Sequence, residues 1–213
     1  MSNAPKPSPP KQKLMVYIDG FNLYHGVHDW SGRKHLWLDL VRLAQTFRPH
    51  QRLVGVRYFT AQVLNNAGAQ SRQGHYIDAL KSQYPHQLEV VEGRYQPKEM
   101  ECRECGSTWT SYEEKETDVN IATSIVVDAA AGLSDSIFVV SGDSDVAPAV
   151  RAAKKARPEL FIAAAFPPER FSRELKDLMP NSIHIAHSKI RQSQLPDEFT
   201  ASGKAFRRPD KWR

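Results

Sequence analysis

The chain has 213 residues, of which 40% are hydrophobic and 25% charged, and its formal net charge is +5. This length suits one domain with a substantial core, and the composition is that of an ordinary globular protein. No apolar run approaches the roughly 20 residues that span a bilayer, and the polar N-terminus lacks the apolar segment of a secretory signal peptide. Two cysteines are too few for a disulfide framework. We therefore expect a cytoplasmic protein that does not associate with a membrane.

The positive charge lies at the two ends of the chain. Residues 1–13 and 191–213 each carry a net charge of +3, which leaves −1 for residues 14–190. Proline-rich, polar sequence predicts a disordered N-terminal tail over 1–13 and a loosely attached basic C-terminal tail over 191–213. Such tails can hold a phosphate backbone without reading its sequence, or they can simply keep a protein in solution. Both interpretations remain open.

Between the tails, short apolar runs typical of strands alternate with helical periodicity. In chain order, strands are predicted at 14–18, 53–59, 88–95, 137–140, 160–165 and 183–186. Helices are predicted at 36–47, 70–84, 118–131, 146–156 and 171–179. This alternation, with several uniformly apolar strands, is typical of a mainly parallel sheet with helices on both faces. It predicts one α/β domain over 14–190, with ligands at the carboxyl ends of the strands.

Four aspartates are expected to converge at that edge of the sheet. Asp19 follows the first strand, Asp143 and Asp145 follow the strand at 137–140, and Asp118 opens the helix that leads into that strand. Clustered carboxylates repel one another, and a bound divalent cation removes the conflict. Oxygen ligands without cysteine or histidine suit Mg²⁺ or Mn²⁺, and the chemistry that follows is in-line displacement at phosphorus.

Each aspartate also has a purely structural interpretation. Asp145 can cap the helix that follows it, and Asp118 can be a favourable charge at a helix N-terminus. Asp19 and Asp143 stand beside glycine, where aspartate commonly forms turns. These separate explanations do not account for the placement of all four residues at one edge of one sheet.

Three segments resemble the signature segments of a known family. They are Tyr-Ile-Asp-Gly-Phe-Asn-Leu at 17–23, Glu-Lys-Glu-Thr-Asp-Val-Asn at 114–120 and Val-Ser-Gly-Asp-Ser-Asp at 140–145. In order and spacing they are similar to those of NYN domains, PIN-like nucleases that are sometimes grouped with LabA-type proteins, and the resemblance covers about residues 14–190. It implies a PIN-like three-layer α/β/α sandwich, dependence on Mg²⁺ or Mn²⁺, and ribonuclease activity.

The resemblance also implies roles for individual residues. The four aspartates Asp19, Asp118, Asp143 and Asp145 correspond to metal-ligating catalytic residues. Asn22 corresponds to a residue that orients the first aspartate, a ligand water or the phosphate. Ser141 resembles a small polar residue that binds substrate phosphate. Classical PIN nucleases often add another helical acidic residue; the candidates here are Asp39 and Asp78, for which a solvated helix face is the favoured interpretation.

An insert at 95–114 interrupts the alternation and contains Cys102 and Cys105, followed by Gly106. A Cys-x-x-Cys-Gly turn is half of a zinc ribbon, and a complete structural Zn²⁺ site needs two further ligands. Histidines or a second copy in a homodimer can complete it. The other interpretation, which is the commoner one for such a pair, is a metal-free β-hairpin that projects from the domain.

The same insert has side chains suited to single-stranded RNA. Trp109 and Tyr112 can stack on bases, while Arg94, together with Lys98 and Arg103, can contact phosphates. Alternatively, the aromatic side chains pack the insert against its own domain. His25, after the first motif, is treated as a surface histidine, although it can also contact a phosphate.

The function that best fits these features is a metal-dependent ribonuclease. The alternative is a catalytically weak or inactive RNA-binding or assembly protein on the same fold, against which the completeness of the four aspartates argues. A phosphatase of the haloacid dehalogenase type needs an aspartate two residues after the first, where this chain has Phe21. A dinucleotide enzyme needs a Gly-x-Gly-x-x-Gly segment after the first strand, and this segment is absent.

Overall fold

A six-stranded parallel sheet forms the centre of the computed structural model, which describes residues 11–213. The strands are β1 (Lys13–Asp19), β2 (Arg52–Thr60), β3 (Leu88–Glu92), β6 (Ser136–Val140), β7 (Phe161–Phe166) and β8 (Ile183–His184). They lie in the order β3-β2-β1-β6-β7-β8, and every neighbouring pair is parallel. The chain therefore builds one half of the sheet outward from β1, then returns to the other side of β1 and builds the second half.

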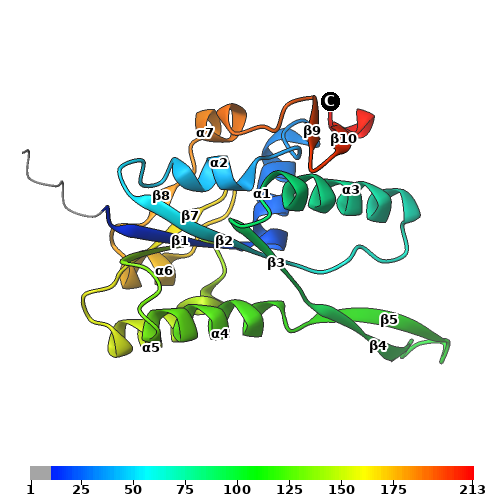
Figure 1. The fold of residues 1–213 in the computed structure, drawn as a ribbon. Helices are drawn as coiled ribbons and strands as arrows, with labels where there is room; N and C mark the ends of the chain where they lie inside the picture. Colours follow the sequence, from blue (N-terminus) through cyan, green and yellow to red (C-terminus); the bar gives the residue numbers. More distant parts are fainter. Residues whose placement is uncertain (1–10) are drawn as a thin grey trace, which may run out of the picture.

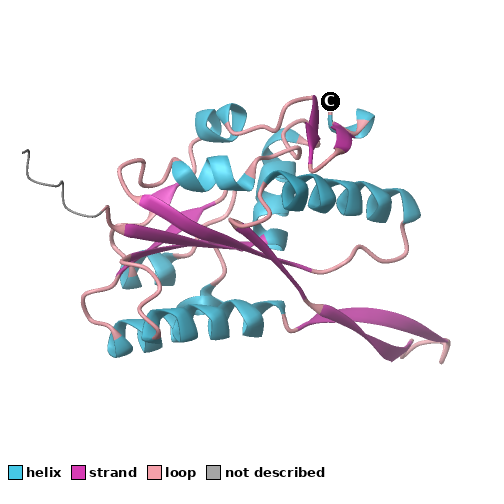
Figure 2. Ribbon diagram, viewed as in Figure 1, coloured by secondary structure: helices cyan, strands magenta, loops and turns pink. Residues whose placement is uncertain are grey.

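Helices cover both faces of this sheet (Figures 1 and 2). One layer consists of α1 (Gly20–Ser31), α2 (Leu40–Gln45), α3 (Ala67–Gln83) and α7 (His187–Gln192). The opposite layer consists of α4 (Thr117–Ala130), α5 (Ala147–Ala156) and α6 (Arg173–Leu178). The predicted PIN-like three-layer α/β/α sandwich is confirmed.

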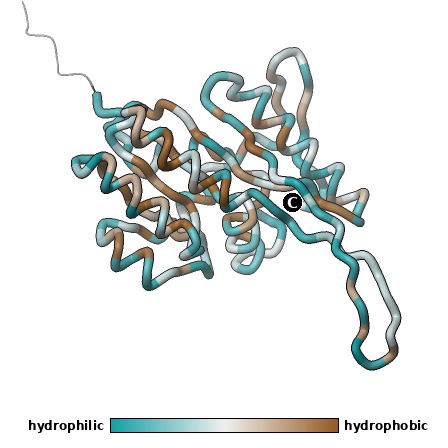
Figure 3. The backbone as a smooth tube through the Cα atoms, turned by 90° about the horizontal axis from the view of Figure 1, so that it is seen from below, coloured by the Kyte–Doolittle hydropathy of each residue, from teal (hydrophilic) through white to brown (hydrophobic). Residues whose placement is uncertain are grey.

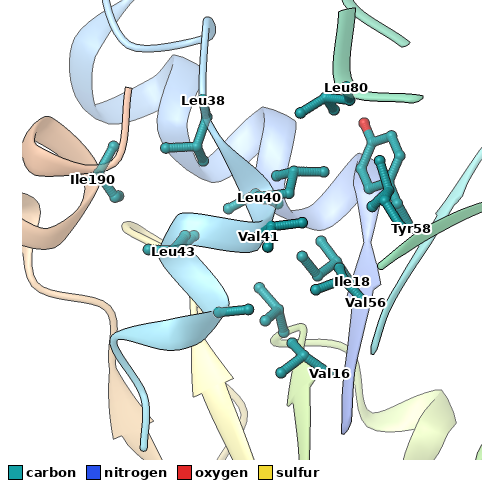
Figure 4. Close-up of a cluster of buried hydrophobic side chains, with 14 of the residues drawn as sticks. Val16, Ile18, Leu38, Leu40, Val41, Leu43, Val56, Tyr58, Leu80 and Ile190 are labelled. Carbon is teal, nitrogen blue, oxygen red and sulfur yellow. The ribbon is translucent and has the colours of Figure 1, made fainter. Parts of the chain in front are cut away.

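The core is double because successive side chains of a strand point to opposite faces. In β1, Leu14, Val16 and Ile18 pack with the layer that contains α2 and α3, as Figure 4 shows for part of this cluster. Met15 and Tyr17 pack with α4 and α5 in a second cluster. A strand buried on both faces must be apolar throughout, which is why the sequence of β1 shows no polar alternation.

Helix α1 was not predicted from the sequence, because its buried face contains two glycines. A Cβ atom on Gly20 would lie 2.5 Å from the Phe59 carbonyl oxygen, and one on Gly26 would lie 2.4 Å from the Pro168 carbonyl oxygen. Close packing of the helix against its neighbours therefore requires residues that weaken the helical signal.

The helix predicted over 36–47 is shorter in the structure, and this prediction is partly wrong. Leu38 forms an antiparallel bridge with Gln194, and the helix begins only after Asp39. The Asp39 carboxylate accepts hydrogen bonds from the Arg42 backbone N–H and the Tyr84 hydroxyl. Asp39 is therefore a buried helix cap, and not the solvated residue that was expected.

The prediction of a loosely attached tail over 191–213 is also wrong. This segment forms the end of α7, an antiparallel hairpin of β9 (Glu198–Ala201) and β10 (Lys204–Arg207), and a final 3₁₀ turn at Asp210–Trp212. Trp212 is only 7% exposed, and its ring centroid lies 5.7 Å from that of Tyr76 and 6.2 Å from that of Trp37. A few large apolar side chains anchor this segment although most of it is polar. Most of the predicted N-terminal tail lies outside the described residues.

The insert forms the predicted hairpin. Strands β4 (Arg94–Glu101) and β5 (Thr108–Lys115) pair only with each other and extend away from the sheet as a polar arm (Figures 1 and 3). Among the described residues, no helix is long and apolar enough to cross a membrane.

A buried charged network ties α4 to the sheet. The Tyr17 hydroxyl donates a 2.6 Å hydrogen bond to Asp128, and the Arg57 guanidinium pairs with the same carboxylate at 2.6 Å. Arg57 also reaches the exposed Glu89 at 2.7 Å. Burial and the neighbouring Asp128 raise the pKa of Tyr17 well above its usual value, so its hydroxyl remains a donor.

We expect Tyr17→Phe to lower the free energy of unfolding by about 2 kcal/mol, because it removes a hydrogen bond to a buried carboxylate. Urea titration followed by circular dichroism measures this change. Glu89→Gln is the matched control, since it alters the exposed end of the network and should change stability by less than about 0.5 kcal/mol. Equal effects of the two substitutions would contradict this assignment.

We expect Trp212→Ala to lower the free energy of unfolding by about 3 kcal/mol or more, because it leaves a cavity beside Trp37 and Tyr76. Thermal unfolding and limited proteolysis of the C-terminal segment measure the effect. Lys211→Ala changes an exposed neighbour and is the control. A Trp212→Ala variant as stable as the wild type would show that the segment is not part of the cooperative unit.

Candidate active site

The candidate site lies at the carboxyl ends of β1 and β6. Here the chain stops adding strands on one side of β1 and begins to add them on the other side. β1 has β2 on one side and β6 on the other, and Ile18 of β1 is paired with Val140 of β6. The two connections that leave these strands lead to opposite halves of the sheet, so their ends are not covered by a common crossover. In open α/β sheets this switch point is where ligands bind. It brings Asp19 next to residues 141–143.

Asp19 is held rigidly at the end of β1. It is 5% exposed and caps α1 by accepting a 2.9 Å hydrogen bond from the Asn22 backbone N–H. Its other oxygen accepts a 3.0 Å hydrogen bond from the Ser141 hydroxyl. Burial raises the pKa of Asp19, and the negative charge of Asp143 adds to this effect, while the hydrogen bonds oppose it.

Asn22 and Ser141 join the two strand ends. The Asn22 side-chain oxygen accepts a 2.8 Å hydrogen bond from the Gly142 backbone N–H. Ser141 accepts a 3.0 Å hydrogen bond from the Asp143 backbone N–H while donating to Asp19. Ser141 is fully buried, so it orients carboxylates and does not reach a phosphate as was expected. The Asn22 side chain bonds to the Gly142 backbone while its own backbone N–H holds Asp19, and its predicted role toward a ligand water or a phosphate stays a prediction.

The side chains at the switch point line one pocket of about 390 Å³. Its lining residues are Asp19, Phe21, Asn22, His25, Glu114, Thr117, Asp118, Asp143 and Arg170. Loss of solvent around the Asp118 carboxylate raises its pKa to about 6, with further contributions from the surrounding carboxylates of Asp19, Asp143, Glu114 and Asp145. Negative charge thus accumulates in this pocket without full compensation.

Two of the lining residues were not identified from the sequence. Glu114, at the end of β5, accepts hydrogen bonds from both the backbone N–H and the hydroxyl of Thr117, and so attaches the hairpin base to the start of α4. Glu114 is the first residue of the family-like segment at 114–120, and this position was the sequence signal that could have identified it. Arg170 comes from the loop after β7 and forms an ion pair with Asp29. No sequence motif marked Arg170.

Gly142 allows the loop that carries Arg170 to approach. A Cβ atom at this position would lie 2.9 Å from the Phe171 backbone nitrogen and 3.0 Å from the Arg170 Cβ. The loop therefore crosses directly over the end of β6, and this crossing brings Arg170 into the lining of the pocket.

Asp145 lies next to the pocket but does not line it. It is exposed, and its backbone N–H donates a 3.0 Å hydrogen bond to the Asp143 carboxylate. Its charge still acts on Asp118. Asp145 is thus the most peripheral of the four predicted aspartates, while Asp19, Asp118 and Asp143 share the pocket.

Arg94 and Trp109, predicted to bind substrate, do not line this pocket. Arg94 pairs with Glu116, and Trp109 lines a separate recess with Tyr95, Tyr112 and residues 63–65. Trp109 and Tyr112 both come from β5, and both are exposed. The helical acidic candidates are also elsewhere: Asp39 caps α2, and Asp78 lines a recess beside α3.

Comparison with known proteins agrees with this geometry. The sequence profile of the NYN domain matches residues 13–186. The chain belongs to the NYN domain family. A curated relative, 6-hydroxy-3-succinoylpyridine 3-monooxygenase HspA of Pseudomonas putida (strain DSM 28022 / S16), is 27% identical over 94% of this chain and 75% of its own length.

A solved structure of a protein of unknown function from Vibrio parahaemolyticus RIMD 2210633 has a similar fold. Its TM-score is 0.55 at 20% identity, and the match covers 85% of this chain and 97% of that chain. At this identity the similarity concerns the fold alone. NYN domains have a nuclease-type fold.

The donor atoms of the pocket suit a hard divalent cation, but their present arrangement is not that of a formed metal site. The acidic side chains offer oxygen atoms only, which is the preference of Mg²⁺ and Mn²⁺. Loss of solvent, and then the neighbouring carboxylates, raise the pKa of Asp118, so its negative charge is unfavourable in the pocket. However, no group of three or more His, Cys, Asp and Glu side chains within residues 11–213 is arranged to hold a metal ion. Charge and donor chemistry therefore favour a cation, and the coordination itself is a proposal.

We expect Asp118→Asn to stabilise the metal-free protein by about 1 kcal/mol near pH 8, a value reduced for solvent screening because this side chain is accessible. The folded-state pKa of Asp118 is about 6, above its ordinary value of 3.8, so ionisation is harder in the folded protein. The cost is therefore fully present above about pH 6 and absent below about pH 4.

Thermal unfolding in a chelating buffer at these two pH values tests this expectation. A gain of about 1 kcal/mol corresponds to a rise in Tm of roughly 2–4 °C for a chain of this size. Asp177→Asn, an exposed aspartate of α6 outside the pocket, is the control. A variant that is less stable than wild type near pH 8 would mean that the Asp118 carboxylate is stabilising.

Proposed function

We propose that this NYN domain is a metal-dependent ribonuclease whose switch-point pocket hydrolyses phosphodiester bonds of RNA. The observation that supports this most is the sharing of one pocket by Asp19, Asp118 and Asp143, with Glu114 beside them. Like charges gathered in a recess destabilise a protein unless the recess binds a cation. We assign the three aspartates as the inner ligands of Mg²⁺ or Mn²⁺, and Asp145 as an outer contributor.

In such a reaction the bound cation and the residues of the pocket would have separate roles. A bound divalent cation would supply activation of water and stabilisation of the charge that develops on the leaving oxygen. Asp19 is oriented before any ligand arrives, because Ser141 and the Asn22 backbone hold both of its oxygens. Fixed ligands of this kind reduce the reorganisation needed in the transition state.

Arg170 is the residue best placed to hold the substrate phosphate. Arg170 lines the acidic pocket, and its guanidinium forms an ion pair with Asp29 of α1. Arginine matches the geometry of a phosphate group through paired N–H donors. His25 lines the same pocket and offers a second contact.

The choice of single-stranded RNA as substrate rests on the family. Exposed aromatic side chains on the hairpin, Trp109 and Tyr112, line one recess and are suited to stacking on unpaired bases. The pocket is an open recess at the surface, as a polymeric substrate requires.

A second candidate comes from the curated relative, which is named as a monooxygenase acting on a substituted pyridine. The match covers 94% of this chain, so it includes the pocket. The succinoyl group of such a compound ends in a carboxylate, and an anion of this kind would also be repelled by the acidic side chains. Both candidate substrates therefore require a cation in the pocket, and only an assay of each reaction separates them.

Cleavage of labelled RNA tests the main proposal. We expect the wild type to cleave single-stranded RNA with Mn²⁺ or Mg²⁺ and not with chelator, and Asp143→Asn to lower the rate by about 100-fold or more. Duplex RNA and single-stranded DNA measure the substrate preference. Asp177→Asn, purified identically, controls for contaminating ribonucleases and should keep full activity.

If the wild type cleaves no substrate faster than Asp143→Asn, the ribonuclease proposal is wrong. Retained RNA binding by the inactive protein would then favour a role in RNA binding or assembly. Oxygen consumption with 6-hydroxy-3-succinoylpyridine and a reduced nicotinamide or flavin would favour the monooxygenase.

A further inference from the structure

The tip of the β4–β5 hairpin carries both cysteines of the chain. The two strands pair along their whole length, from Arg94 opposite Lys115 to Glu101 opposite Thr108. Eight residues of strand extend for about 27 Å, so the turn at 102–107 lies well away from the sheet (Figures 1 and 3). The cysteines therefore have no part in the acidic pocket.

The two thiols lie on a turn that is fixed by backbone hydrogen bonds. The Gly106 backbone N–H donates a 2.8 Å hydrogen bond to the Cys102 carbonyl, and the Cys102 N–H donates a 2.9 Å hydrogen bond to the Ser107 carbonyl. Gly106 has φ of +67°, a left-handed conformation that favours glycine. This is the local backbone that allows a Cys-x-x-Cys pair to bind one metal ion.

The turn also affects the ionisation of the Cys105 thiol. Hydrogen bonds from the hydroxyl and the backbone N–H of Ser107, and a further one from the Cys102 thiol, lower the pKa of Cys105 to about 7. The Cys105 sulfur lies 3.1 Å from the Ser107 hydroxyl. The turn thus favours the thiolate form, which is the form that binds zinc.

The same copy of the chain has no side chains to complete the site. A structural Zn²⁺ ion takes four ligands in tetrahedral geometry. Every histidine of the sequence lies outside the hairpin, at positions 25, 28, 35, 50, 75, 86, 184 and 187. In the part of the chain that the structure describes, no third His, Cys, Asp or Glu joins the pair in a possible metal site. The other two ligands must then come from another molecule.

The surface around the turn suits a second copy. Trp109 is 49% exposed and pairs across the strands with Met100, directly beside the cysteine turn. The turn also carries Arg103 and Glu104, charges of opposite sign that a twofold axis can bring together. A copy approaching tip to tip would cover the exposed indole and bring a second pair of thiolates.

We propose that Cys102 and Cys105 of two copies bind one zinc ion and join the molecules tip to tip as a dimer. Zinc is favoured over Mg²⁺ here because its ligands are thiolates. The two acidic pockets, at the hairpin bases, then lie at opposite ends of the assembly. This proposal is independent of the reaction proposed for the pocket.

Zinc content and molecular mass of the full chain test the proposal. In reducing buffer with zinc supplied, we expect half a zinc ion per chain by elemental analysis. We expect light scattering to give twice the mass of the 24.1 kDa chain. Cys102→Ser and Cys105→Ser should both lose the zinc and become monomeric. Ser111→Ala, a matched hairpin substitution away from the thiols, should keep both properties.

Two further measurements exclude trivial explanations. Unchanged thermal unfolding of the cysteine variants would show that the domain remains folded, as expected for substitutions at an exposed turn. Cobalt substituted for zinc should give the absorption of a tetrahedral tetrathiolate centre, and this absorption should disappear in the variants.

The proposal is overturned by one zinc ion per monomeric chain, by the absence of zinc from a protein with two free thiols, or by a dimer that persists in the cysteine variants. A disulfide between Cys102 and Cys105 in reducing buffer, seen as a chain mass lower by two hydrogen atoms after denaturation and removal of zinc, would also overturn it.

Discussion

The buried carboxylate of Asp19 is the constraint around which the candidate site is arranged. It ends β1, caps α1, and accepts a hydrogen bond from Ser141 at the end of β6. Because these groups belong to the two halves of the sheet, the carboxylate holds the switch point together while facing the pocket. A side chain in this position must be small, negatively charged and accept hydrogen bonds from two directions, which aspartate does.

The same arrangement stores electrostatic strain. Asp143 and Asp118 lie near a carboxylate that is already buried. Loss of solvent and the neighbouring carboxylates together raise the pKa of Asp118 to about 6. Packing elsewhere must offset this cost. The double apolar core and the network of Tyr17, Arg57 and Asp128 beneath β1 provide that stability, and the network attaches α4, the helix that carries Asp118.

The hairpin couples two regions with different chemistry. At its base, Glu114 bonds to Thr117 and lines the acidic pocket, where oxygen ligands suit a hard cation. At its tip, the turn at 102–107 carries two thiols, which suit a softer cation such as Zn²⁺. The ladder between them pairs only with itself, so these two regions lie at opposite ends of one hairpin.

The sequence by itself determined the alternation of strands and helices, because burial on both faces makes a strand uniformly apolar over a local stretch. It also determined the edge at which the aspartates gather, because the carboxyl ends of parallel strands all lie at one edge of the sheet. Only the tertiary structure showed that Ser141 is buried and holds Asp19, and that Arg170 enters the pocket over Gly142.

The folding of residues 191–213 onto the domain through Phe206 and Trp212 was likewise decided only in three dimensions. Each of these features depends on contacts between residues far apart in the chain, and local periodicity carries no information about such contacts. A polar segment with two large apolar side chains looks like a tail until the surface that buries those side chains is known.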